Sequence, residues 1–149
     1  MAQEHPMLGN ILSLADPELW RSSIELAGQG TTAWLDRIDP SQLERIELVG
    51  CGSSLYNAQV GKYVLERFAH ISTQATPGFA FAAYVEPAIL GPRTLVVGIS
   101  TTGGTQTVCD SLARARDAGS PTLAITAHAG SLITQVAGAT ILTGGHNDA

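Results

Sequence analysis

The chain has 149 residues, of which 44% are hydrophobic and 14% charged, so it is long and apolar enough for one folded domain with its own core. Its net charge is −5, and the first 45 residues carry seven acidic against three basic side chains, which argues against a DNA-binding arm or any other nucleic-acid partner. No apolar run approaches the roughly 20 residues that span a bilayer, the first residues lack the basic region of a signal peptide, and two cysteines do not make a disulfide framework, so we expect a cytoplasmic protein without a membrane partner.

The first 45 residues are expected to form a helical lead-in. Three helices are predicted, over residues 7–14, 17–27 and 32–38. Asp16 and Pro17 suit the N-cap and the first position of the second helix, because aspartate accepts from free amides and proline lacks one. Trp20 and Trp34 are expected to cover an exposed side of the sheet or to contact a partner subunit.

From Ile46 onward, short apolar strands alternate with helical segments. The predicted strands are 46–51, 72–76, 94–99, 122–126 and 140–143. The predicted helices are 55–68, 105–118 and 131–136, and 79–85 is either a short helix or a crossover. Strands separated by helices imply right-handed crossovers and a parallel sheet with helices on both faces, so the fold class is α/β.

Two of these helices have a clear apolar pattern. In 55–68 the apolar residues at helical spacing are Tyr56, Val60, Tyr63, Val64 and Phe68. In 105–118 the inner face is expected to consist of Val108, Leu112 and Ala115. Gly119 is a natural stop for the second of these helices, and Ser131 is a fair N-cap for the segment that follows it.

Two short loops, Gly50–Ser54 and Ser100–Thr105, carry the chemistry. Each follows a buried strand, opens a helix, and is made of glycines and hydroxyl residues. Small residues let a ligand approach the backbone, and the free amides of a helix N-terminus attract anions. For one loop alone, plain N-capping by serine or threonine is the alternative. Two such loops at the carboxyl ends of strands, where parallel sheets bind their ligands, favour one phosphate held from two sides.

Standard nucleotide motifs do not occur in either loop. The phosphate-binding loop that ends in Gly-Lys-Ser/Thr is absent, and Lys62, the single lysine of the chain, is predicted to lie in the middle of a helix. The Gly-x-Gly-x-x-Gly sequence of dinucleotide-binding domains is also absent after the first strand. The four histidines are too scattered to indicate zinc, so we expect neither a metal nor another cofactor.

The two loops together resemble the SIS (sugar isomerase) domain family. The resemblance rests on Cys51–Ser54 followed by a tyrosine-containing helix, and on Ser100–Thr105 after the strand that ends at Ile99. The chain is most similar to the branch with the isomerase half of glutamine–fructose-6-phosphate transaminase (glucosamine-6-phosphate synthase) and the fructosamine-phosphate deglycases. The resemblance extends from about residue 7 to residue 145.

Membership of that family would imply a flavodoxin-like three-layer αβα sandwich with a five-stranded parallel sheet that binds a phosphorylated sugar or amino sugar. Residues 46–149 would be such a domain, as the first of two in a longer chain, and a homodimer or higher oligomer is expected. By motif position, the phosphate would be held by Ser53, Ser54, Ser100, Thr102 and Thr105, with Thr101 contributing its backbone or side chain. The supporting loop glycines would be Gly52, Gly103 and Gly104.

The sequence departs from the family pattern at three places. Thr102 replaces a serine and keeps the hydroxyl, whereas Gly104 replaces a common glutamate and loses the carboxylate. Pro77–Phe79 lacks the acidic residue that the family often has there.

The catalytic acid and base are not identified by the sequence. Aldose–ketose isomerisation needs a base that moves a proton between adjacent carbons, and His128 and Glu86 are the available candidates. Exposure to solvent is the simpler interpretation of both. The resemblance implies an isomerase, an aminotransferase-type isomerising enzyme or a deglycase, and a non-catalytic phosphosugar-sensing module is the alternative.

Overall fold

A computed structural model describes residues 15–144; the helix predicted over 7–14 lies outside that range. Five parallel strands form one sheet in the order β2-β1-β3-β4-β5. The strands are β1 (Arg45–Gly50), β2 (Ser72–Pro77), β3 (Thr94–Ile99), β4 (Thr122–Thr126) and β5 (Ala139–Leu142). The α-helices are α2 (Pro17–Leu35), α3 (Ser53–Phe68), α4 (Gly78–Tyr84), α5 (Gln106–Asp117) and α6 (Leu132–Val136), with 3-10 turns at Pro40–Gln42 and Pro87–Ile89.

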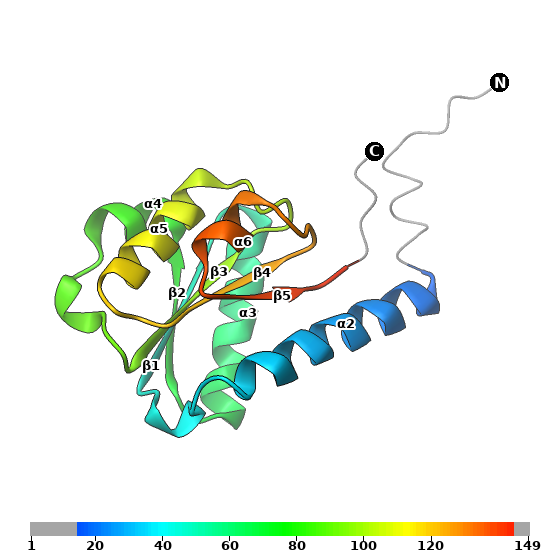
Figure 1. Ribbon diagram of the computed structural model, residues 1–149, viewed down its shortest axis with the longest axis horizontal. Coiled ribbons are helices and arrows are strands. Elements are labelled where there is room, and N and C mark those ends of the chain that lie inside the picture. The colour runs from blue at the N-terminus through cyan, green and yellow to red at the C-terminus, as the bar shows by residue number, and fades with distance from the viewer. Residues whose placement is uncertain (1–14, 145–149) are drawn as a thin grey trace.

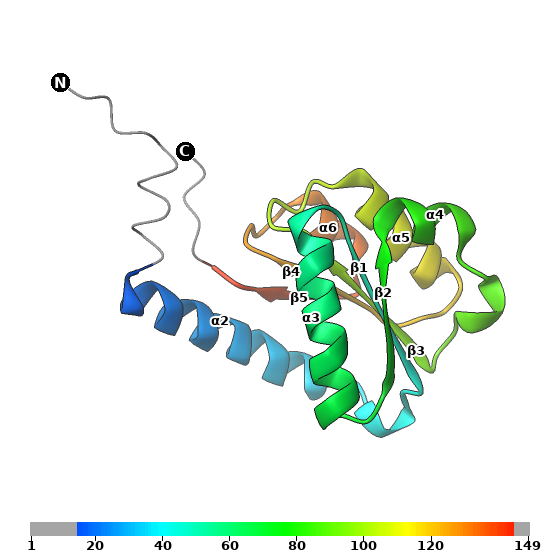
Figure 2. The same ribbon diagram turned by 180° about the vertical axis from the view of Figure 1, so that it is seen from behind.

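Helices cover both faces of the sheet, which confirms the predicted three-layer sandwich. Helices α4, α5 and α6 lie on one face, and α3 lies on the other (Figures 1 and 2). Helix α2 runs beside β5, where Gly30 lies so close to the strand that an added Cβ would be 3.3 Å from the Ile141 Cα. Among residues 15–144, none of the helices combines the length and the apolar content needed to cross a membrane.

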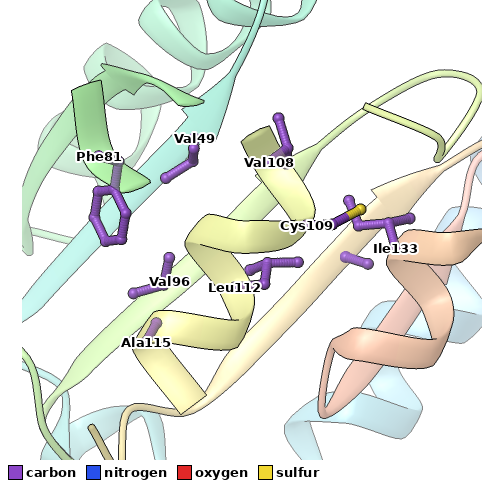
Figure 3. Packing of buried hydrophobic residues seen from close by; sticks show 9 residues of the cluster. Val49, Phe81, Val96, Val108, Cys109, Leu112, Ala115 and Ile133 are labelled. Atoms are coloured by element: carbon purple, nitrogen blue, oxygen red, sulfur yellow. The ribbon is translucent and has the colours of Figure 1, made fainter. Parts of the chain in front are cut away.

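Helix α5 packs its predicted inner face onto the sheet. Val108, Leu112 and Ala115 are fully buried against Val49 of β1 and Val96 of β3 (Figure 3). The fit is close at Gly98, where a Cβ would come within 2.8 Å of the Leu112 side chain. This packing fixes where α5 begins, and therefore where the loop between β3 and α5 lies.

Helix α3 packs on the sheet through small residues. Ser54 and Ala58 are buried, and a Cβ on Gly61 would lie 3.3 Å from the Leu48 side chain. A stripe of larger apolar residues normally faces the core, but the stripe of α3 points to solvent. Its members are between 50% and 77% exposed: Tyr56, Val60, Tyr63, Val64 and Phe68.

The two helices predicted over 17–27 and 32–38 are one helix, so that division was wrong. Its N-terminus is as predicted, because the Asp16 carboxylate accepts from the Glu18 amide at 2.9 Å and Pro17 occupies the first turn. Gly28 and Gly30 lie inside this helix, and each glycine costs only about 1 kcal/mol there, which is too little to break it. The Thr31 and Thr32 hydroxyls donate to carbonyls one turn earlier, which is compatible with a continuous helix.

Candidate functional site

The two glycine- and hydroxyl-rich loops lie side by side at the carboxyl edge of the sheet. Gly50, the last residue of β1, is the register partner of Ile99, the last residue of β3, so both loops leave the sheet at the same level. Helix α3 then crosses one face and α5 the other (Figures 1 and 2). The crevice between two strands whose connections diverge in this way is where open α/β sheets bind ligands.

In the first loop, the serines belong to the helix and are not its cap. The N-cap of α3 is Gly52, which has a φ of +54° and makes no side-chain cap hydrogen bond. Ser53 is exposed and Ser54 is buried at the first two helical positions. The Ser54 amide donates to the Cys51 carbonyl at 3.1 Å. The first turn of α3 therefore presents an exposed hydroxyl beside its N-terminus, where the helix dipole favours an anion.

In the second loop, two hydroxyls bond to each other and hold the loop. Ser100 is buried, and its Oγ lies 3.0 Å from the Thr105 Oγ1 and accepts from the Gly103 amide at 3.1 Å. Thr105 is the N-cap of α5 but makes no side-chain cap hydrogen bond. Neither loop therefore caps its helix through a side chain, which removes the plain N-capping alternative for both.

The loop after β4 supports the second loop from behind. The Thr101 carbonyl accepts from the Ala127 amide and from the Thr126 hydroxyl, both at 3.1 Å. Gly103 has a φ of +69°, and a Cβ there would lie 2.1 Å from the Ser131 Oγ. These contacts hold one side of the loop in place.

The other side of the second loop is open. Thr101 and Thr102 are exposed, and the Thr102 Oγ1 accepts from the Gly104 amide at 3.4 Å. Gly104 is also exposed, and a Cβ there would meet nothing closer than 3.9 Å. The predicted ligands thus divide into the exposed Ser53, Thr101 and Thr102 and the more enclosed Ser54, Ser100 and Thr105.

The edge that carries these loops is nearly free of charge. The described connections after the five strands contain one side chain that can become a cation, His128, and no carboxylate. His128 is half-buried, and its carbonyl accepts from the Ser131 hydroxyl at 2.8 Å. Glu86 is exposed and follows α4, at the opposite end of that helix from this edge, and its carboxylate accepts from the Ala88 amide at 3.4 Å. An anion here would depend on amides, hydroxyls and helix dipoles.

The two cysteines differ in their surroundings. Cys51 directly follows β1 and is half-buried, with its Sγ 3.4 Å from the Thr107 Oγ1, and it is not in a disulfide. Cys109 is buried in the core, and burial, followed by the charge of Asp110, raises the pKa of its thiol. Cys109 is therefore a packing residue.

A cavity of about 550 Å³ opens beside the second loop. Asn57 of α3 and Thr101 line one part of it, and apolar side chains of the sheet, including Leu48, Ile99 and Ile125, line another. Leu19, Trp20 and Ser23 of α2 also contribute. Sequence reasoning did not single out Asn57, although its position one turn after Ser53 is the signal that places it near the loop.

Comparison with known proteins identifies the family of this arrangement. The model of the SIS domain matches residues 41–147. The isomerising glutamine–fructose-6-phosphate aminotransferase of Corynebacterium glutamicum is 34% identical over 110 residues, which is 72% of this chain and 17% of that protein. Fructoselysine 6-phosphate deglycase of Escherichia coli is 37% identical over 95 residues, which is 64% of this chain and 28% of that protein.

The fold is also similar to that of a solved structure. The C-terminal domain of glucosamine-fructose-6-phosphate aminotransferase from Francisella tularensis superposes with a TM-score of 0.78 over 95% of this chain and 40% of that one, at 19% identity. At this identity the likeness concerns the fold. The chain thus spans between 17% and 40% of the length of these three proteins.

Proposed function

Because the chain belongs to the SIS domain family, we propose that it binds a phosphorylated sugar or amino sugar, with the phosphate between the loops after β1 and β3. One observation supports this most: the two hydroxyl-rich loops leave the sheet at the same height, at the crevice where α3 and α5 diverge. At the N-terminus of neither helix does the N-cap residue make a side-chain hydrogen bond to the backbone. A phosphate monoester needs several donors in a concave site, and neutral donors suffice where helix dipoles add partial positive charge.

The exposed and enclosed hydroxyls would have different roles. Ser53 and Thr102 are exposed, so their hydroxyls and the amides near them would contact the phosphate directly. Ser100 and Thr105 already bond to each other, so they would hold the loop in shape around the anion. The sugar would extend into the adjoining cavity, where Asn57 offers an amide that both donates and accepts.

Catalysis is a further step of the proposal. The relatives are named as isomerising or deglycase enzymes, and this chain corresponds to a small part of each. We propose that it is the phosphate-holding part of such an enzyme. The second candidate is a non-catalytic sensing module, because catalysis of this kind needs an acid and a base. Apart from a cysteine, the described connections after the strands bring one ionisable side chain, His128, to this edge. The cytoplasmic location and the oligomeric state stay predictions.

Thermal unfolding with and without ligand tests the phosphate site. A ligand with a Kd of about 1 mM, present at about 10 mM, adds about 1.4 kcal/mol to the stability of the folded state. For a chain of this size, that raises the Tm by about 3–6 °C. We expect this shift with fructose 6-phosphate or glucose 6-phosphate, and none with the unphosphorylated hexoses at equal ionic strength. No shift with any hexose phosphate would contradict the proposal.

Substitution of the exposed hydroxyls tests which residues bind. Ser53→Ala combined with Thr102→Ala should remove most of the ligand-induced shift while leaving the Tm of the free protein nearly unchanged, because both side chains are exposed. Ser72→Ala, at an equally exposed serine at the opposite edge of the sheet, is the matched control. Turnover of fructose 6-phosphate to glucose 6-phosphate by the unmodified chain would show that it carries catalytic groups of its own and would exclude the sensing module.

A further inference from the structure

The cavity beside the second loop is lined by uncharged side chains. Among the described residues that line it there is no aspartate, glutamate, lysine, arginine or histidine. On α2, Arg21 directly follows Trp20, but it forms an ion pair with Glu18, and neither of the two lines the cavity. Within residues 15–144, a charged group on a ligand would therefore meet no lining side chain of opposite charge.

Apolar side chains form a large part of the cavity wall. Leu48, Ile99 and Ile125 come from the three neighbouring strands β1, β3 and β4, and Leu65 of α3 adds to them. Ile99 is the last residue of β3, so the apolar wall begins where the second loop starts. Transfer of a charged group from water into such surroundings costs far more than transfer of a hydroxyl or an amide that can be hydrogen-bonded.

Two helix N-termini raise this cost further for a cation. Helix α3 begins at Ser53 and α5 at Gln106, both at the edge that carries the two loops. Each N-terminus carries a partial positive charge of about half an elementary charge. This charge stabilises a phosphate and opposes a positive group elsewhere on the same ligand. The described connections after the five strands contain no carboxylate that would offset it.

We propose that the site selects neutral phosphosugars, which carry a hydroxyl or an acylamino group, over sugar phosphates with a free amino group. This inference rests on the proposed phosphate site and narrows its ligand class. Discrimination would come from leaving the ammonium group of the rejected ligand desolvated and unpaired. An N-acetyl group would suit the cavity, because its methyl group matches the apolar wall and its amide can bond to Asn57.

Three ligands that differ only at carbon 2 test this selectivity: glucose 6-phosphate, glucosamine 6-phosphate and N-acetylglucosamine 6-phosphate. Isothermal titration calorimetry at about pH 6.5, where an amine of this kind is protonated, measures the three Kd values. We expect glucosamine 6-phosphate to bind at least about fivefold more weakly than the other two.

The outcomes separate this inference from the proposed function. Equal binding of glucosamine 6-phosphate and glucose 6-phosphate overturns the selectivity and leaves the phosphate site standing. Weak binding of both nitrogen-containing ligands also overturns it, because the exclusion would then follow size and not charge. Failure of all three ligands to bind contradicts the phosphate site and this inference with it.

A carboxylate placed in the cavity should change the preference. Asn57 is exposed and lines the cavity, so Asn57→Asp adds a charge there without a change of shape. It should improve binding of glucosamine 6-phosphate relative to glucose 6-phosphate by at least about threefold, as expected for an exposed ion pair. Because repulsion between the new carboxylate and the phosphate affects both ligands, the ratio of the two Kd values isolates the ammonium group.

Gln59→Glu is the matched control for this variant. It adds the same charge at an exposed position two residues further along α3 that does not line the cavity, so the ratio of the two Kd values should stay at the wild-type value. Circular dichroism and the Tm should show that both variants fold. A ratio that is unchanged in Asn57→Asp, or that changes equally in both variants, overturns the placement of the sugar in this cavity and the inference drawn from its lining.

Discussion

Replacement of Gly103 by alanine should disrupt the second loop more than any other glycine substitution at this edge. Gly103 has a φ of +69°, a conformation that costs a residue with a Cβ roughly 1–2 kcal/mol. The new Cβ would also lie 2.1 Å from the Ser131 Oγ, 2.5 Å from its Cβ and 3.0 Å from the Thr126 Oγ1. Relief of this overlap requires a shift of one loop against the other, at a further cost of about 1–2 kcal/mol.

Gly103→Ala should therefore lower the free energy of unfolding by about 2–4 kcal/mol, or the Tm by about 5–15 °C. Two neighbouring glycines separate the causes. Gly52 has a φ of +54° and a ψ of −128°, a conformation used almost only by glycine, but open space around it, so Gly52→Ala should cost about 1–3 kcal/mol from backbone strain alone. Gly104 has neither a positive φ nor a close neighbour, so Gly104→Ala should be neutral. Urea unfolding of the three variants measures these differences, and a Gly103→Ala variant within about 0.5 kcal/mol of wild type refutes the reasoning.

Three further predictions follow from buried groups. In the unmodified protein the buried Glu47 carboxylate lies 2.6 Å from the Arg45 guanidinium. Arg45→Ala would leave this carboxylate without its cation and should destabilise the protein by about 2–3 kcal/mol in urea unfolding; the double variant with Glu47→Gln should recover part of the loss. Iodoacetamide at mildly alkaline pH should modify Cys51 well before Cys109 in the native protein, as mass spectrometry would show; equal rates would contradict the burial and raised pKa of the Cys109 thiol. Folding raises the pKa of the Cys109 thiol, so the stability that the protonated thiol contributes is fully present below its unfolded pKa near 9.0 and is lost as the pH rises through its folded pKa. Cys109→Ala should therefore reduce the loss of stability at alkaline pH, as unfolding measured across that pH range would show.

The strands and the two loops could be predicted from the sequence because their signals are local. β3 lies over Thr94–Ile99 as predicted, since a run of β-branched and apolar residues buried on both faces has few alternatives in a parallel sheet. The N-terminus of α2 was found from Asp16 and Pro17 for the same reason. The length of α2 could not be predicted in the same way, because Gly28 and Gly30 resemble the end of a helix when only the sequence is considered. The reason for a glycine at position 30 is the close approach of α2 to Ile141, which no local pattern reveals.

The roles within the site were harder to predict than its place. Every serine and threonine of the two loops has the same chemical capacity in the sequence. The fold separates them, because Ser100 is used inside the loop by the Gly103 amide and the Thr105 hydroxyl, whereas Thr102 and Ser53 stay at the surface. That difference depends on the loop after β4, which lies about 25 residues further along the chain and holds the second loop from behind.

Helix α3 shows why periodicity alone misplaces a face. A pattern of large apolar residues marks one side of a helix, but the side that meets a sheet is decided by how closely the backbones must approach. Here α3 begins directly at the end of β1, where a Cβ on Gly50 would lie 2.8 Å from the Ser54 carbonyl carbon. Small residues are required at the start of α3, so Ser54, Ala58 and Gly61 face the sheet there, and Leu65 packs against the core further along the helix. The larger apolar residues of α3 face outward: Tyr56, Val60, Tyr63, Val64 and Phe68. The same close approach at the start of α3 therefore leaves an apolar surface on the outside of the helix, and the position of the first loop and this outward surface follow from one packing constraint.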